Sequence, residues 1–144
     1  MKKCALLMLI VLGTSTAVWA GPWANVIVPC DACSGQDTII KVGACLPGTF
    51  NECKTNVEWC VKGNVILVDI YLTRTDKCHG SLQLCEDVNL MTLCPGRYSA
   101  VARVYIKDVG PCAWYSNYVI SAVGSAIFDV ANCNPCCPPW VWPF

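Results

Sequence analysis

Apolar and polar residues alternate in short runs along this chain, and turn-forming residues separate the runs. The clearest case is the stretch 56–72, which a turn at 62–64 divides in two. Before the turn, Val57, Trp59 and Val61 alternate with Asn56, Glu58 and Cys60. After the turn, one face collects Ile66, Val68, Ile70 and Leu72, and the other collects Val65, Leu67, Asp69 and Tyr71. Side chains alternate across a β-strand with a period of two, so this stretch predicts a β-hairpin with one face on a core.

Similar alternation predicts further strands at 24–29, 36–45, 96–108 and 125–131. In the run 96–108 the basic residues all share one side, which identifies the other side as the one that points to the core. None of these runs has the period of a helix. We therefore predict an all-β fold, a two-sheet antiparallel sandwich of about seven strands that is rich in disulfides.

The beginning of the chain has the composition of a secretory signal. Lys2 and Lys3 precede the apolar stretch 5–12, and Val18-Trp19-Ala20 offers small or modest residues at the positions that a signal peptidase reads. The apolar stretch is shorter than the ~20 residues that span a bilayer, which disfavours the alternative of an uncleaved anchor. We expect residues 1–20 to be removed, no transmembrane segment to remain, and the mature protein to be secreted to the periplasm, the cell surface or the extracellular medium.

Cysteine is unusually frequent, since the chain has 13 and all but Cys4 follow residue 20. An even number of cysteines in a small exported chain indicates a disulfide framework, because export delivers thiols to an oxidising compartment. The candidates are Cys30, Cys33, Cys45, Cys53, Cys60, Cys78, Cys85, Cys94, Cys112, Cys133, Cys136 and Cys137. The sequence leaves their pairing open, although we expect Cys45 with Cys53 and Cys78 with Cys85 to close local loops.

Length and pattern indicate a single domain. We expect it to span residues 21–132 and to be followed by a Cys/Pro/Trp-rich C-terminal tail at 133–144. Charged residues make up only 14% of the chain, against an ordinary value of about 25%. A chain held together by cross-links can do with fewer surface charges. A surface that a partner buries would also fit the low charged fraction. No run of basic residues occurs in the sequence, so the electrostatic footprint of nucleic-acid binding is lacking.

The segment Leu93-Cys94-Pro95-Gly96-Arg97-Tyr98 carries a family resemblance. It resembles the L-x-P-G-x-Y corner before a late strand of immunoglobulin-like and fibronectin type III-like sandwiches, and the stretch 26–130 is similar in layout to small exported, cysteine-rich bacterial domains of this class. The resemblance implies that the Tyr98 hydroxyl bonds to the backbone a few residues upstream. Antibody-type domains have a cysteine where this chain has Ala100, so antibody-type function is not implied.

Two C-x-x-C elements, Cys30/Cys33 and Cys133/Cys136, raise the alternatives of a zinc site and a thiol-redox site. Zinc-binding pairs normally lie closer along the chain, and Pro138-Pro139 soon after the second element opposes the helix on which a reactive thiolate sits. Structural disulfides are therefore the favoured interpretation, and we expect no bound metal and no cofactor.

Residues able to carry catalysis are sparse. His79 is the only histidine, and it lies in an expected loop between two cysteines. Glu86 and Asp87 are adjacent and typical of a solvated edge, and the sequence has no glycine-rich phosphate loop. We therefore expect no catalytic residues and a protein that is not an enzyme.

Aromatic residues are the remaining candidates for a partner surface: Trp114, Tyr115, Tyr118, Trp140, Trp142 and Phe144. Packing against the domain is the alternative for these rings. The sequence thus favours a secreted, disulfide-stabilised binding or structural module that contacts an unknown protein or a surface glycan through loops on a rigid scaffold. Two other functions stay open: a secreted inhibitor or toxin-like effector, and a metal-binding or thiol-redox protein.

Overall fold

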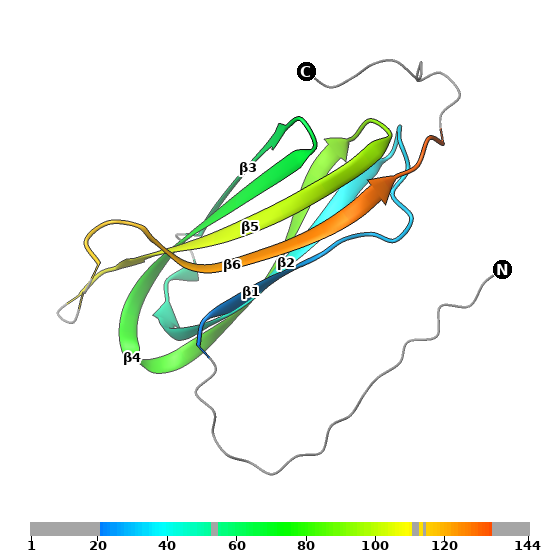
Figure 1. Cartoon of the computed structure of the whole chain (residues 1–144). Coiled ribbons are helices and arrows are strands. Elements are labelled where there is room, and N and C mark those ends of the chain that lie inside the picture. The colour runs from blue at the N-terminus through cyan, green and yellow to red at the C-terminus, as the bar shows by residue number, and fades with distance from the viewer. Residues whose placement is uncertain (1–20, 53–54, 111–112, 114, 134–144) are drawn as a thin grey trace, which may run out of the picture.

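The computed structural model describes residues 21–52, 55–110, 113 and 115–133, and its regular structure is formed by strands (Figure 1). They are β1 (Trp23–Ile27), β2 (Asp37–Phe50), β3 (Asn56–Lys62), β4 (Val65–Thr92), β5 (Gly96–Asp108) and β6 (Val119–Val130). The predicted all-β class is confirmed. The expected signal at 1–20 and residues 134–144 of the expected tail lie outside the described residues. Within the described ranges, no helix is long and apolar enough to cross a membrane.

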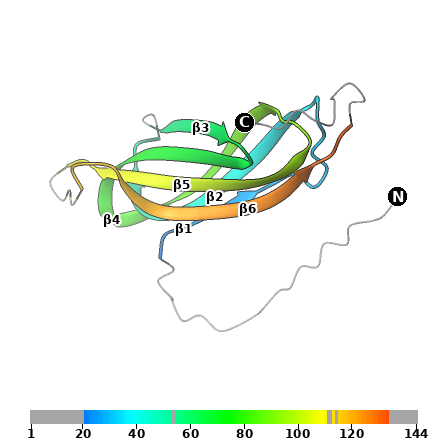
Figure 2. The ribbon, with the colours of Figure 1, turned by 45° about the horizontal axis from the view of Figure 1, so that its top comes forward.

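The strands form one sheet in the order β1-β2-β4-β5-β6, and β3 also pairs with β4. Residues 65–74 of β4 pair with β3 and β5, whereas its later residues pair with β2. β4 bends between these two parts, so the sheet folds back on itself and is nearly barrel-like (Figure 1, Figure 2). The predicted strand number and pairing need correction, because the described part has six strands in one sheet and β5 runs parallel to β4.

The second part of β4 takes the place of an expected cysteine-bearing loop. The sequence predicts that the strand ends near Leu72, whereas it continues to Thr92 because it pairs with β2 beyond the bend. Gly48 on β2 and Gly80 on β4 have φ angles of 115° and 83°, which favour glycine. A side chain at Gly48 would also lie 2.7 Å from the backbone oxygen of Asp76. Glycine therefore lets β2 approach the bend closely.

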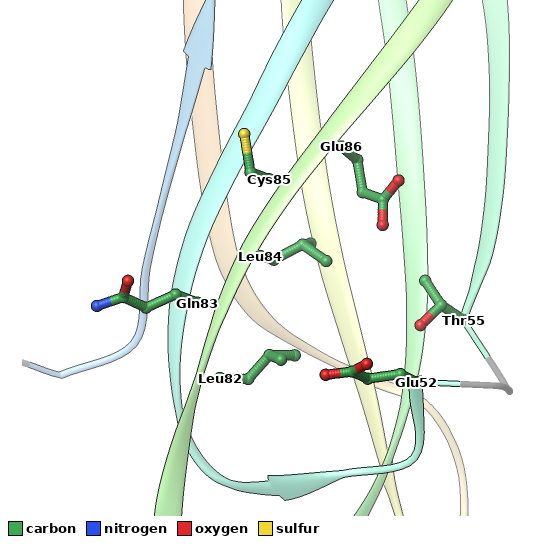
Figure 3. Close-up of a pocket in the computed structure, with 7 residues that line it drawn as sticks. All are labelled: Glu52, Thr55, Leu82, Gln83, Leu84, Cys85 and Glu86. Carbon is green, nitrogen blue, oxygen red and sulfur yellow. The ribbon is translucent and has the colours of Figure 1, made fainter.

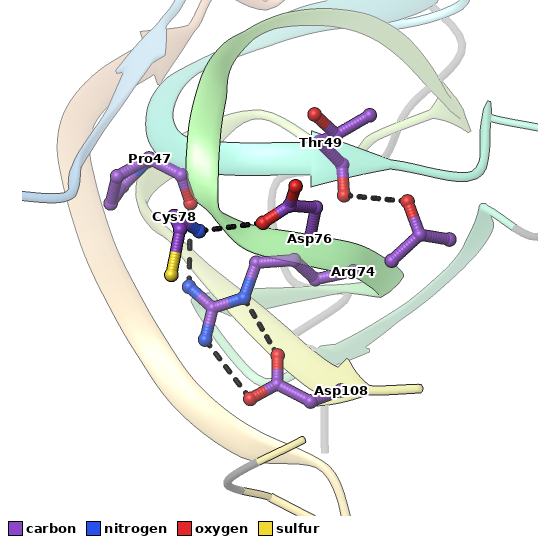
Figure 4. Close-up of polar contacts among 7 residues, drawn as sticks. Pro47, Thr49, Arg74, Asp76, Cys78 and Asp108 are labelled. Carbon is purple, nitrogen blue, oxygen red and sulfur yellow. Dashed lines mark hydrogen bonds and ion pairs between the residues drawn. The ribbon is translucent and has the colours of Figure 1, made fainter. Parts of the chain in front are cut away.

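Arg74 lies at this bend and holds three strands together (Figure 4). Its Nε and Nη2 donate to the Asp108 carboxylate of β5 at 2.6 and 3.1 Å, and its Nη1 donates to the Pro47 carbonyl of β2 at 3.3 Å. The side chains of Arg74 and Asp108 are only 11% and 4% exposed. The bidentate geometry offsets the cost of removing both charges from water. Loss of either side chain would leave the other as a buried charge without compensation.

The core lies between the two halves of the sheet and contains the inward residues that the alternation predicts. On β4 these are Ile66, Val68, Ile70 and Leu72; on β2, Ile40, Val42 and Ala44; on β5, Tyr98, Ala100, Ala102, Val104 and Ile106. All of them are buried, so the predicted faces of these strands are confirmed. Burial of each large aliphatic side chain contributes roughly 1.5–3 kcal/mol before conformational entropy is counted.

Among the described residues, four ion pairs join side chains directly opposite each other on neighbouring strands: Lys41–Asp87, Asp69–Arg103, Arg74–Asp108 and Arg97–Asp129. Opposite charges across a strand pair stabilise it, and like charges there destabilise it. The charges therefore favour the observed register over neighbouring ones.

The predicted corner at Tyr98 forms the hydrogen bond that the resemblance implies. The Tyr98 hydroxyl donates to the Cys94 carbonyl at 3.0 Å, and its ring stacks on Phe128 of β6 with 5.9 Å between the ring centres. The bond satisfies the polar end of an otherwise buried ring. It thereby ties the connection after β4 to β5.

The two outermost strands of the sheet, β1 and β6, meet at a seam. The Ala24 carbonyl oxygen of β1 lies 2.7 Å from the point that a Cβ atom at Gly124 of β6 would occupy, so only glycine permits this approach. At the end of β6, Ser34 N–H donates to the Ala131 carbonyl and Ala131 N–H donates to the Ala32 carbonyl, each at 2.9 Å. These contacts close the seam at that end.

A disulfide between Cys33 and Cys133 lies next to these backbone bonds, with 5.5 Å between the Cα atoms. It closes a loop of 100 residues, for which the chain-entropy model gives about 4.7 kcal/mol of stabilisation. The disulfide also joins one member of each C-x-x-C element, which leaves Cys30 as a thiol.

The other described cysteines do not form the expected framework. Free thiols are present at Cys30, Cys45, Cys60, Cys78, Cys85 and Cys94. The predicted Cys78–Cys85 loop is wrong, because both residues lie on one strand, seven residues apart. An extended strand rises about 3.3 Å per residue, so residues seven apart on it lie roughly 23 Å from each other. The Cα atoms of a disulfide must lie only about 4.4–6.8 Å apart. The expected partner of Cys45, Cys53, lies outside the described residues. Cys53, Cys112, Cys136 and Cys137 lie outside the described residues.

Candidate functional site

The outward surface of β3, the first part of β4, β5 and β6 gathers the candidate binding residues. Its rows across the four strands are Asn56-Tyr71-Tyr105-Ile120, Glu58-Asp69-Arg103-Val123, Cys60-Leu67-Val101-Ser125 and Lys62-Val65-Ser99-Ile127. The surface therefore has an aromatic row at one end, a charged row beside it, and then two rows in which four of the eight side chains are aliphatic.

Three tyrosines form a cluster in the aromatic row. Tyr71 and Tyr105 are opposite each other on parallel strands, and their rings stack at 4.9 Å between centres with 17° between planes. Tyr118, just before β6, meets Tyr71 edge-on at 5.2 Å. We call these residues the tyrosine cluster. Aromatic pairs in these geometries contribute about 0.5–1.5 kcal/mol beyond area burial, so the rings hold each other in place.

Arg103 links the tyrosine cluster to the charged row. Its Nε and Nη2 donate to the Asp69 carboxylate at 2.6 and 2.7 Å, and its guanidinium carbon lies 5.7 Å from the centre of the Tyr105 ring. Glu58 is opposite Asp69 on β3 and accepts a hydrogen bond from the Asn56 amide at 3.1 Å. The arginine is thus fixed by a carboxylate and by an aromatic face.

Two polar groups of this surface have raised pKa values. The pKa of Tyr71 is raised, first by desolvation and then by the negative charges of Asp69 and Glu58. The pKa of Arg103 is raised mainly by its hydrogen bond to Asp69. At neutral pH the surface therefore offers a neutral phenol and a guanidinium cation as hydrogen-bond donors.

Beside the charged row, β6 presents large aliphatic side chains to solvent. Ile120, Val123 and Ile127 are 53%, 55% and 67% exposed. Three more outward aliphatic side chains lie on β4 and β5, and we call the whole set the apolar outer face: Val65, Leu67, Val101, Ile120, Val123 and Ile127. Strands in a sheet with one solvated face normally place polar residues outward. The apolar outer face departs from that pattern.

Of the aromatic residues predicted as a partner surface, the structure places Tyr118 in the tyrosine cluster. Tyr115 is exposed, and its backbone oxygen accepts a hydrogen bond from Asp108 N–H at 3.0 Å, outside the cluster. Trp114, Trp140, Trp142 and Phe144 lie outside the described residues.

Sequence reasoning missed Tyr71, Tyr105 and Arg103 as parts of a site. One signal was present, because the run 65–72 is aliphatic or aromatic on both faces except at Asp69. Strands that are covered on both faces read as continuous apolar runs. That signal indicates a covered outer surface, although it does not reveal which strand lies alongside.

A pocket of about 240 Å³ lies between the connection from β2 to β3 and the second part of β4 (Figure 3). Its lining residues are Glu52, Thr55, Leu82, Gln83, Leu84, Cys85 and Glu86. Ligand sites commonly enclose about 300–1,000 Å³, so this pocket is small for an organic ligand. It ranks below the outward surface as a candidate site.

Groups for metal or acid–base chemistry are scattered. Among the residues that the structure describes, no group of three or more His, Cys, Asp or Glu side chains is arranged to hold a metal ion. His79 Nδ1 lies 2.9 Å from the Asp76 carboxylate, and this hydrogen bond is the main cause of the lowered pKa of Asp76. Both side chains are solvated, so the pair serves local structure at the bend.

Comparison of this chain with protein-family models, with curated proteins and with solved structures found no match.

Proposed function

We propose that this protein is an exported binding module that contacts a protein partner through the tyrosine cluster, Arg103 and the apolar outer face. The observation that carries the proposal is the exposure of two aliphatic side chains on β6: Val123, which lies opposite Arg103, and Ile127, which lies opposite Ser99. Contiguous apolar surface bordered by polar groups marks interaction sites. Tyrosine and arginine are also enriched among the residues that dominate binding energy at protein interfaces.

A protein fits this surface better than a glycan does. Sugars stack on open aromatic faces, whereas Tyr71 and Tyr105 stack on each other and Tyr118 meets Tyr71 edge-on. The exposed aliphatic side chains would remain uncovered by a polar sugar, at a cost of about 25 cal/mol for each Å² of apolar area left in water. A partner with its own apolar side chains would remove that area from water.

For the scaffold, we propose an immunoglobulin-like sandwich in which the bend of β4 connects the layers. One layer would contain β1, β2 and the second part of β4, and the other would contain β3, the first part of β4, β5 and β6. The Tyr98–Cys94 hydrogen bond supports this architecture. The composition of residues 1–20 and the Cys33–Cys133 disulfide support export, because disulfides persist in oxidising compartments.

Site-specific photo-crosslinking tests the binding surface. The photoreactive residue p-benzoylphenylalanine replaces Val123 in one variant and Ile39 in a matched control, which is 48% exposed on the outer side of β2. Both proteins are expressed in the cells that export the chain, irradiated, and analysed for adducts heavier than the chain. We expect a discrete partner adduct from position 123 and none from position 39.

The partner identified in this way is then purified, and its affinity for the protein is measured. We expect Arg103→Ala and Tyr105→Ala each to weaken binding at least tenfold, while Ile39→Ala leaves it unchanged. Equal adducts at both positions, no adduct at position 123, or unchanged affinity in the two site variants would each contradict the proposed function.

A further inference from the structure

The segment 134–144 combines aromatic and proline residues and has no charged side chain. Its large apolar residues are Trp140, Val141, Trp142 and Phe144, and its prolines are Pro135, Pro138, Pro139 and Pro143. Proline cannot donate a backbone hydrogen bond to a strand ladder, which opposes pairing of this segment along the edge of β6. Its aromatic side chains each offer about 150–250 Å² for burial. A segment of this kind is suited to lie across an apolar surface.

The structure fixes the point at which this segment begins. Cys133 is bonded to Cys33, and its backbone N–H donates to the Ser34 hydroxyl at 3.2 Å. The segment therefore starts at the end of β6, on the strand that carries Ile127 and Val123 of the apolar outer face. These two residues are the first large outward aliphatic side chains that a returning chain would meet.

The chain length matches that return. With a turn at Cys133 and Asn134, Ile127 lies six residues before the first of these and Trp140 lies six residues after the second. Each stretch spans roughly 20 Å when extended. A segment that turns back along β6 would bring Trp140 level with Ile127, and Phe144, four residues further, level with Val123.

We infer that residues 134–144 are the ligand of the apolar outer face of their own chain, and that an external partner must displace them. This inference rests on the proposed function of that surface. Arg103 and Asp69 of the neighbouring row already bond to each other, so a neutral segment over Val123 leaves neither of these charges without its partner. A short tether also supplies an effective concentration of order millimolar, which favours the segment over free occupants. The partner's own contact segment is therefore uncharged and aromatic, like the one it replaces.

The experiment uses the full mature chain with p-benzoylphenylalanine in place of Trp142. Unlabelled and ¹⁵N-labelled protein are mixed in equal amounts, irradiated, and cleaved before aspartate, which separates 108–128 from 129–144 at Asp129. We expect adducts between these two peptides. In each adduct both peptides should be unlabelled or both labelled, because they come from the same chain. The double substitution Val123→Lys with Ile127→Lys should lower the adduct yield at least fivefold, and Ile39→Lys should leave it unchanged. All three substituted residues are exposed, and circular dichroism verifies that each variant is folded.

Adducts of mixed isotopic composition would show that the segment of a second copy occupies the face, which overturns the inference. Adducts on another surface, or no adduct, would overturn it as well. These outcomes remain separate from the proposed function. If position 123 still crosslinks to an external partner, only the covering by residues 134–144 fails. If the segment crosslinks to the face but no partner does, the proposed binding function fails and the segment completes the fold.

Discussion

Arg103 on β5 and Asp69 on β4 lie directly opposite each other, and two hydrogen bonds of 2.6 and 2.7 Å join the guanidinium to the carboxylate. Two residues further along both strands, the same register stacks Tyr71 on Tyr105. A slip of one residue would separate both pairs and turn one strand's side chains to the other face. The ion pair therefore positions the tyrosine cluster.

A double-mutant cycle with Arg103→Ala and Asp69→Ala measures this pair. We expect a coupling free energy of about 0.5–1 kcal/mol from urea unfolding, because the pair is bidentate but still in contact with water. The matched control is Arg97 with Asp129, an opposite pair on β5 and β6 that is far more exposed and should couple less. Equal coupling in the two cycles would contradict a special role for Arg103.

The seam between β1 and β6 predicts the effect of Gly124→Ala. The new methyl group would lie 2.7 Å from the Ala24 carbonyl oxygen, so β1 must move away from β6. We expect a loss of about 1–3 kcal/mol in the free energy of unfolding, measured by urea denaturation. Ser125→Ala is the control, since Ser125 is exposed on the same strand and its replacement should change stability by less than about 0.5 kcal/mol. A neutral Gly124→Ala variant would refute the tight seam.

Loss of the Cys33–Cys133 bond should destabilise the protein more than loss of any described free thiol. Cys33→Ser with Cys133→Ser is expected to lower the free energy of unfolding by about 2–5 kcal/mol. Cys60→Ser is the control, because Cys60 is exposed and has a free thiol. Wild-type protein treated with a reductant should behave like the double variant. If Cys60→Ser is equally destabilising, this thiol is engaged in a bond that the structure does not contain.

Alkaline pH should weaken the fold through Tyr98. Its pKa is raised, mainly by burial, so the phenol resists ionisation in the folded protein. Below the ordinary tyrosine pKa of about 10 both states keep the proton, and the stability contribution is fully present. As pH rises beyond that value the unfolded state ionises first, and stability is lost.

Unfolding free energies measured between pH 8 and pH 11 test this expectation. Tyr98→Phe should lower stability at pH 8 by about 1 kcal/mol through loss of the hydrogen bond to Cys94, and it should flatten the alkaline decline. An unchanged slope in Tyr98→Phe would assign the decline to other groups.

The local part of the fold was predictable from the sequence. Alternation identified the inward residues of β2, β5 and the first part of β4, because a period of two survives wherever one face is buried. The second part of β4 was not predictable, since residues 76–84 alternate weakly and contain Gly80 and two charged residues. That part is a strand only because β2 lies beside it, and such long-range pairing overrides local preference.

The candidate site was predictable only at Tyr118. Tyr71 and Tyr105 are 34 residues apart, and the parallel pairing that stacks them depends on the bend of β4. Alternation placed both Val65 and Leu67 on an outward face, yet it could not show that β5 and β6 would extend this face with more aliphatic side chains. The predicted Cys78–Cys85 loop failed for a similar reason, because spacing in sequence resembles a short loop even when both cysteines lie on a single strand.

Residues 32–34 obtain their neighbours only after residues 131–133 have been synthesised, because backbone bonds and a disulfide join these distant stretches. Ribosomes add about 5–20 residues per second, so a gap of 100 residues corresponds to roughly 5–20 seconds. During that delay β1 and β2 have no β6 to meet, and their apolar side chains are open to wrong associations. A chain released from the ribosome before residue 119 would lack β6, the strand that closes the fold, so we expect such truncated products to be bound by chaperones or degraded by proteases.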